Sequence, residues 1–212
     1  MGLSIGLVGL PNVGKSTTFN ALTKAQNAEA ANYPFCTIEP NKAVVPVPDS
    51  RLDELAKIVN PERILYSTLD FVDIAGLVKG ASKGEGLGNK FLSNIRETEV
   101  ILQIVRCFED ENIVHTEGSI DPIRDIEIIE TELILADVEV LQNRIERLKK
   151  QAKADKKAAA LMEFANELAE YLADGNLARS FPKIDDALFE ELNRDLRLLT
   201  SKEIMYGANV DE

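Results

Sequence analysis

The apolar residues in the first half of the chain, and again near its end, come in short continuous runs. Runs that are apolar throughout are typical of strands buried on both faces of a parallel sheet. Segments with helical character and glycine- or proline-rich turns separate these runs, so the sequence predicts an α/β fold with a mainly parallel sheet flanked by helices. The expected strands are 4–8, 42–47, 68–74, 99–107 and 204–208, and the expected helices between them are 15–23, 50–58 and 90–97.

The pattern changes after Asp121. Apolar residues recur at helical spacing from Ile126 to Leu148 with glutamates between them, which predicts a long amphipathic helix. A second stripe, from Leu161 to Leu172, predicts a helix that Gly175 can end. The two helices are expected to pack as an antiparallel, coiled-coil-like hairpin. A third helix is expected at 187–199.

Charge and composition exclude several classes of protein. The net charge of −12 gives the chain no general attraction for nucleic acid, and we expect no DNA partner. The two cysteines, Cys36 and Cys107, are too few for a secreted disulfide scaffold, which favours a reducing cytoplasm. No apolar run reaches the roughly 18 residues of a membrane helix, so no membrane partner is expected.

The most specific motif follows the first expected strand. The segment Gly9-Leu10-Pro11-Asn12-Val13-Gly14-Lys15-Ser16 matches the phosphate loop of nucleotide hydrolases in full. Its glycines allow a tight turn whose backbone N–H groups, from Asn12 to Gly14, face a polyphosphate, and the following helix adds its positive end. Lys15 can reach the β- and γ-phosphates, Ser16 can ligate Mg²⁺, and Thr17 is expected near the α-phosphate.

Two further segments suit a metal ion and a γ-phosphate. Asp73 ends the third expected strand, where it can hold a Mg²⁺-bound water, and the N–H of Gly76 can sense the γ-phosphate. Thr37 lies in the loop before the second strand, where its hydroxyl can ligate Mg²⁺ when a triphosphate is bound. The glycine-rich stretch 76–88 costs much entropy to order, and we expect it to be mobile until a ligand binds.

The segment after the last expected strand bears on the choice of base. GTPases carry Asn-Lys-x-Asp there, and the Asp accepts two hydrogen bonds from guanine. Here the segment reads Asn209-Val210-Asp211-Glu212, so Val210 replaces the Lys and Glu212 replaces the Asp. The longer side chain of Glu212 misplaces its carboxylate, and a site with a misplaced acceptor loses much of its discrimination.

These motifs together make the chain resemble the YchF-type Obg-like ATPases, a family in the translation-factor-related class of P-loop hydrolases. The resemblance rests on the phosphate loop, on Asn32-Tyr33-Pro34-Phe35-Cys36-Thr37, on Asp73-Ile74-Ala75-Gly76 and on the altered base segment. It implies ATP rather than GTP, Mg²⁺, association with ribosomes, Thr37 as a metal ligand, and contacts from Asn209 and the Val210 backbone to adenine. Because family members continue into a further strand, a helix and a TGS domain, we expect the chain to be the N-terminal portion of such a protein.

The catalytic group is not obvious from the motifs. Leu77 stands where many GTPases place a glutamine that orients water, and leucine cannot do so. His115, the only histidine, lies in a polar loop after the strand 99–107, and the carboxyl ends of parallel strands are where such sites form. We therefore hypothesise that His115 helps to position water. Asn12 offers another route, because in related hydrolases an Asn at this position helps to hold K⁺.

The resulting prediction is a phosphate-loop domain formed by 1–121 and 200–212, with the helical segment 122–199 inserted. The predicted activity is Mg²⁺-dependent ATP hydrolysis by a ribosome-linked switch protein. Three alternatives stay open: a GTPase with relaxed base choice, a nucleotide-gated binding module with incidental hydrolysis, and a helical scaffold with an inactive site. The presence of Lys15, Ser16 and Asp73 argues against the last.

Overall fold

The structure, a computed structural model, describes residues 3–27, 42–74 and 87–211. Its elements, in chain order, are β1 (Leu3–Val8), α1 (Lys15–Asn27), β2 (Lys42–Pro46), α2 (Ser50–Val59), β3 (Thr68–Asp73), α3 (Leu87–Glu97), β4 (Val100–Arg106), α4 (Pro122–Gln151), α5 (Lys156–Ala173), the 3-10 turn η3 (Ala178–Ser180), α6 (Ala187–Leu196), the 3-10 turn η4 (Leu199–Ser201) and β5 (Glu203–Asn209). Each predicted strand and helix is present, and most boundaries differ by a few residues.

The five strands form one sheet in the order β2-β3-β1-β4-β5. Among the described strands, β1, β3, β4 and β5 pair in parallel, and only β2 pairs antiparallel, with its neighbour β3. The prediction of a mainly parallel sheet is therefore confirmed. This order brings the carboxyl ends of β1, β3, β4 and β5 to one edge, where ligands of open α/β sheets bind.

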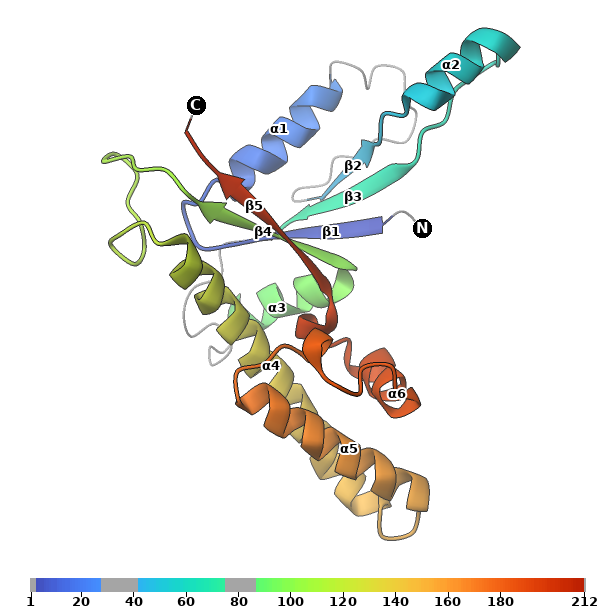
Figure 1. Cartoon of the computed structure of the whole chain (residues 1–212), viewed down its shortest axis with the longest axis vertical. Helices are drawn as coiled ribbons and strands as arrows, with labels where there is room; N and C mark the ends of the chain where they lie inside the picture. Colours follow the sequence, from blue (N-terminus) through green and yellow to red (C-terminus); the bar gives the residue numbers. More distant parts are fainter. Residues whose placement is uncertain (1–2, 28–41, 75–86, 212) are drawn as a thin grey trace.

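Helices cover both faces of the sheet (Figure 1). On one face, Phe19 of α1 packs with Ile5 and Leu7 of β1 and with Phe71 of β3. The opposite face carries a second core, in which Val8 is joined by buried residues of α3 and the first turns of α4. These residues are Phe91, Leu92, Ile95, Ile129, Leu133 and Ala136.

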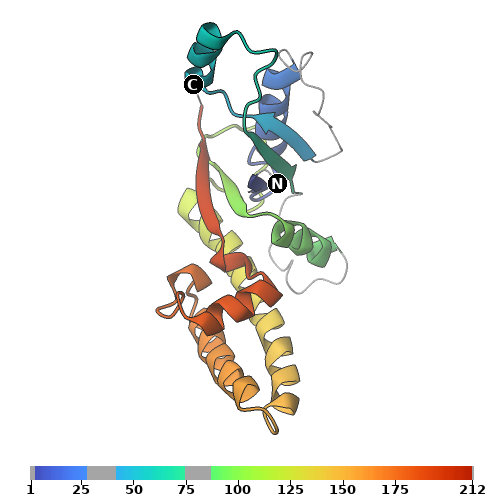
Figure 2. The same cartoon turned by 90° about the vertical axis from the view of Figure 1, so that its right-hand side faces the viewer.

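The segment between β4 and β5 is helical, and α4 and α5 form a hairpin that extends away from the sheet (Figures 1 and 2). It has a core of its own, which includes Leu141, Leu148, Leu168 and Leu172, all nearly or fully buried. α4 belongs to both cores, because its first turns pack under the sheet and its later turns pack on α5. The packing thus has no break between residues 121 and 122, where the predicted insertion begins.

Aspartates begin four of the helices. Asp49, Asp121, Asp155 and Asp186 each accept a hydrogen bond from a backbone N–H of the first turn of α2, α4, α5 and α6. A short acceptor at this position satisfies an N–H that the helix itself leaves free. Ser50, a residue type that often caps helices, is the first helical residue of α2, and the preceding Asp49 takes the capping role.

Candidate nucleotide-binding site

The phosphate loop joins β1 to α1 and passes very close to neighbouring backbone and side chains. A Cβ at Gly9 would lie 2.5 Å from the carbonyl oxygen of Ile104, and one at Gly14 would lie 2.4 Å from the side-chain nitrogen of Asn209. Gly14 also has a φ of 100°, which side chains disfavour. Both positions therefore require glycine, which supports the motif-based prediction by a contact argument independent of the pattern.

Lys15 lies at the start of α1 with its side chain folded back over the loop. Its Nζ donates to the carbonyl oxygen of Leu10 at 2.7 Å, and only 6% of the residue is exposed. Burial lowers the pKa of Lys15 to about 8, and the nearby charge of Asp73 partly opposes this shift. An amine held in this way gains strongly from an anionic ligand, because phosphate charge would offset its desolvation.

Ser16 and Asp73 meet across the edge of the sheet. The Ser16 hydroxyl donates to Asp73 Oδ2 at 3.0 Å, although the residues are 57 positions apart. The other carboxylate oxygen, Oδ1, is buried and has no hydrogen-bond partner within the described residues. A hydroxyl beside a carboxylate with a spare oxygen is the donor set that Mg²⁺ prefers, with the carboxylate acting through a bound water. The residues present therefore fit this ion.

The end of β5 lies against the phosphate loop. Asn209 donates from Nδ2 to the carbonyl oxygen of Val13 at 3.0 Å, while its own carbonyl oxygen accepts from the N–H of Cys107 at 2.7 Å. Val210, the next residue, is 63% exposed. Asn209, a predicted base-side residue, thus contacts the predicted phosphate loop, and Val210 follows it in the chain.

Asn12 links the phosphate loop to the loop that follows β4. It adopts a φ of 62°, which asparagine tolerates better than most residues, and it donates from Nδ2 to the carbonyl oxygen of Val114 at 3.1 Å. The side-chain oxygen of Asn12 is the atom that the K⁺ hypothesis needs. Sequence reasoning missed the Val114 contact, because its acceptor is a backbone carbonyl and leaves no signature in the sequence.

His115 lies in the same loop but is buried rather than open to solvent. Its exposed fraction is 8%, its Nε2 lies 2.8 Å from Asp125 Oδ2, and its Nδ1 accepts from the N–H of Glu117 at 3.1 Å. A neutral ring that accepts at Nδ1 carries its proton on Nε2, which then donates to Asp125. To reach a water at the γ-phosphate, His115 would have to exchange one of these contacts. Its catalytic role stays a prediction.

Several predicted residues lie outside the described part of the chain. They are the metal ligand Thr37, the phosphate sensor Gly76 and the water-site residue Leu77, together with Glu212 of the base segment. Of the mobile stretch predicted at 76–88, only 87 and 88 are described, and they lie in α3. Within residues 3–27, 42–74 and 87–211, no cluster of three or more His, Cys, Asp or Glu side chains could hold a metal.

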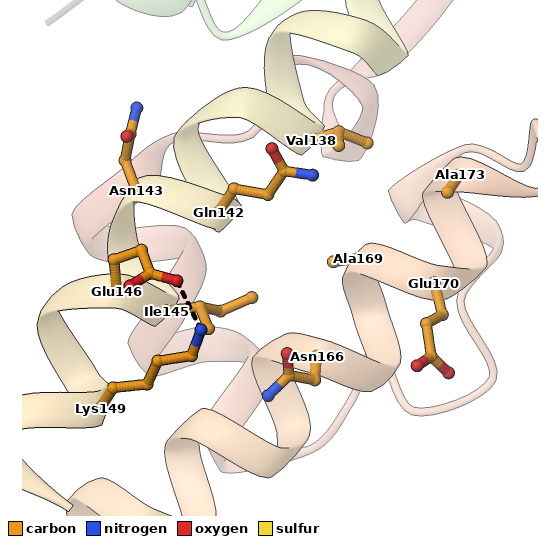
Figure 3. A pocket seen from close by; sticks show the side chains of 10 residues that line it. All are labelled: Val138, Gln142, Asn143, Ile145, Glu146, Lys149, Asn166, Ala169, Glu170 and Ala173. Carbon is orange, nitrogen blue, oxygen red and sulfur yellow. Dashed lines mark hydrogen bonds and ion pairs between the residues drawn. The ribbon is translucent and has the colours of Figure 1, made fainter.

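The hairpin carries a hollow well away from the phosphate loop. It has a volume of about 570 Å³ and follows the seam between α4 and α5 (Figure 3). Its walls include the side chains of Gln142, Asn166 and Glu170, and Lys149 pairs with Glu146 on its α4 side.

None of the described helices is long and apolar enough to cross a membrane.

Comparisons with known proteins bear on this site. A sequence model of the family described as "50S ribosome-binding GTPase" matches residues 4–163, which contain the phosphate loop, Asp73 and the loop after β4. The chain belongs to this family. The 50S ribosome-binding GTPase family is named for a guanine nucleotide, whereas the curated relatives described next carry ATPase names.

Proteins named "Ribosome-binding ATPase YchF" are similar over the whole chain, which confirms the resemblance found in the sequence. The identity is 58% to the protein of Haemophilus ducreyi, 56% to that of Escherichia coli O157:H7 and 54% to that of Bacillus subtilis. The solved structure of the Schizosaccharomyces pombe YchF GTPase is 40% identical, with a TM-score of 0.84 over 100% of this chain and 57% of that one. The chain spans 58% of the length of the first two of these relatives and 57% of that of the third.

Proposed function

We propose that this chain binds ATP with Mg²⁺ and hydrolyses the bond between the β- and γ-phosphates, as a cytoplasmic switch protein that associates with ribosomes. The observation that carries the proposal is the contact between Ser16 and Asp73 beneath a complete phosphate loop. A hydroxyl, a carboxylate with a spare buried oxygen and a desolvated lysine all converge where a triphosphate and its metal would lie. A structural role alone gives no reason to bury Lys15 beside a loop of N–H donors.

The residues divide the work by position. Backbone N–H groups of 12–14 and the amine of Lys15 bind phosphate charge, and Thr17 follows them in α1. Ser16, Asp73 and Thr37 would hold Mg²⁺, which when bound neutralises charge on the β- and γ-oxygens. Asn209 and Val210 would contact the base, and Gly76 would report the γ-phosphate. His115 would position the attacking water, and Asn12 would contribute to a K⁺ site.

Base choice is the part of the proposal with a rival. The replacement of Lys and Asp by Val210 and Glu212 supports adenine, as do the ATPase names of the curated relatives. The family description and the name of the Schizosaccharomyces pombe protein favour a GTPase. Isothermal titration with ATP and with GTP, each with Mg²⁺, separates the two. A clear preference for GTP would reject the adenine assignment.

The site assignment is tested with Lys15→Ala and a matched control. Lys15→Ala should abolish triphosphate binding and leave the fold intact, since the lysine supplies phosphate charge rather than core packing. Lys57→Ala, at an exposed lysine with 69% of its side chain accessible, should bind like the parent. Normal ATP affinity in a folded Lys15→Ala protein would refute the assignment, and phosphate release under turnover conditions would separate an enzyme from a binding module.

The ribosome part needs a separate test. Support comes from the names of the relatives, which are longer than this chain. Co-sedimentation with ribosomes should be stronger with a non-hydrolysable ATP analogue than with ADP if the protein is a nucleotide switch. Equal co-sedimentation in the two nucleotide states would mean that the protein binds ribosomes but that the nucleotide does not control this binding.

A further inference from the structure

Arg106, the last residue of β4, is a buried cation that none of the sequence motifs uses. Only 1% of the residue is exposed, which places it among the largest fully buried side chains of the described structure. Within the described ranges it forms no ion pair with an acidic side chain. Burying a charge without a counter-charge is costly, so such a group persists only where other contacts compensate.

The compensation comes from one loop. Nε of Arg106 donates to the carbonyl oxygen of Phe108 at 3.1 Å, Nη1 to that of Ile113 at 2.9 Å, and Nη2 to that of Asp110 at 3.2 Å. The guanidinium also lies 4.6 Å from the centre of the Phe108 ring. The loop from 108 to 113 is therefore folded around a single side chain, and we call these three hydrogen bonds the Arg106 clamp.

The clamped loop contacts the nucleotide site at both of its ends. At its start, the N–H of Cys107 donates to the carbonyl oxygen of Asn209, whose side chain reaches Val13 in the phosphate loop. At its far end, the carbonyl oxygen of Val114 accepts from the side chain of Asn12. The phosphate loop is thus contacted from two sides by groups that are hydrogen-bonded to, or belong to, the segment after β4.

We propose that Arg106 is a positioning residue for nucleotide binding, acting through the clamp on Asn12 and Asn209 without touching the nucleotide. The clamp orders the loop before the ligand arrives, so that binding does not have to include this ordering cost. The inference rests on the proposed nucleotide-binding function of the same site. It predicts that the geometry of the guanidinium matters, because only a planar fork can serve three carbonyls at once.

The decisive variant is Arg106→Lys, which keeps the positive charge and loses the fork. Its dissociation constant for ATP with Mg²⁺ should rise on the order of 10-fold or more, while the single-turnover rate at saturating ATP changes far less. Hydrogen exchange at Cys107 and Ile113 should become faster. Arg144→Lys is the control: this arginine lies in α4, is also mostly buried and pairs with Asp195 away from the site. It should leave ATP affinity unchanged.

The comparison with Asn12→Ala tests whether Arg106 acts through the phosphate loop. The double variant Arg106→Lys/Asn12→Ala should lose less affinity than the sum of the two single variants, because the clamp acts partly through Asn12. Full additivity would overturn the proposal, as would parental affinity in a folded Arg106→Lys protein. If the parent itself binds no nucleotide, the proposed function fails instead, which makes the two failures distinguishable.

A last measurement does not need an Arg106 variant, which matters if Arg106→Lys fails to fold. In Asn12→Ala, the amide of Ile113 should keep its slow exchange, because the clamp still holds the loop. Fast exchange across 107–116 in Asn12→Ala would mean that the phosphate loop orders the neighbouring loop, rather than the reverse. That result would overturn the proposal.

Discussion

Asp137 in α4 offers the sharpest test of how the helical segment is joined to the sheet. It is fully buried, and its carboxylate accepts from the N–H of Leu199 at 2.9 Å and from the N–H and hydroxyl of Thr200 at 2.8 Å each. Arg96 lies near the end of α3, and its Nη1 is 3.5 Å from Asp137 Oδ1. Burial raises the pKa of Asp137, and the hydrogen bonds and Arg96 act in the opposite direction.

Asp137→Asn keeps the shape but replaces an acceptor oxygen by an NH₂ group that faces N–H donors. One buried donor then lacks an acceptor, at a cost of about 1–3 kcal/mol, and removing one partner of a buried ion pair costs about 3–5 kcal/mol. Arg96 retains carbonyl partners at Leu196 and Arg197, so we expect a loss near the lower limit, about 3 kcal/mol. With a urea m value of about 2 kcal/mol/M, the unfolding midpoint should fall by roughly 1.5 M.

The assay is urea unfolding followed by circular dichroism, with Glu190→Gln as the control. Glu190 pairs with Arg194 on the surface of α6, where both side chains are more than two-thirds exposed, at 76% and 72%. Loss of such a pair changes stability by about 0.5 kcal/mol or less. If the Asp137→Asn midpoint moves no further than that of Glu190→Gln, the carboxylate does not stabilise the junction and the reasoning is wrong.

Four further predictions concern Lys15, His115 and Leu168. Burial lowers the pKa of Lys15 from 10.5 to about 8, so ATP binding above pH 8 should take up a proton and the affinity for ATP should fall as pH rises. Titration calorimetry in buffers of different ionisation enthalpy measures this uptake, and an absence of uptake would contradict the prediction. Between pH 8 and 10.5 the unfolded chain therefore binds more protons at Lys15 than the folded chain does. The free energy of unfolding should rise with pH across this range. His115→Ala should lower single-turnover hydrolysis by on the order of 10²–10⁴-fold with ATP affinity nearly unchanged, and hydrolysis at the parental rate would remove His115 from the mechanism. Leu168→Ala should destabilise the hairpin by about 2–5 kcal/mol in thermal or urea unfolding, since Leu168 is fully buried between α4 and α5, and a loss below 1 kcal/mol would contradict that packing.

The parts of the site that sequence predicted best are those whose chemistry is local. Gly9, Gly14, Lys15 and Ser16 stand in one turn, and the backbone conformation they need restricts their identity strongly. Asp73 was predictable because a polar residue at the end of a buried strand has few structural reasons to be there. Its contact with Ser16 depends on the parallel pairing of β1 with β3, which the sequence pattern did not predict.

The parts that sequence did not predict depend on distant partners. In the sequence, Asp137 has the spacing of a polar residue on the outer face of an amphipathic helix. It is a buried acceptor because it binds the backbone N–H of Leu199, 62 positions later. Arg106 follows an apolar run and looks like a surface residue at a strand end, because its three acceptors are backbone carbonyls. His115 was expected in a polar loop, and its burial was not predicted because the sequence around Asp125 carries no local signal of pairing with it.

The double membership of α4 has a consequence for any attempt to divide this protein. Ile129, Leu133 and Ala136 cover one face of the sheet, so a deletion that begins at Pro122 would strip that face and expose Val8 and Ile104 to water. A minimal nucleotide domain would have to keep α4 through Asp137 and shorten the hairpin only beyond that point. The hairpin can therefore be shortened at its tip, but the first turns of α4 cannot be removed without loss of the core under the sheet. Variation in the length of the helical segment is expected to concentrate between 141 and 172, far from the phosphate loop.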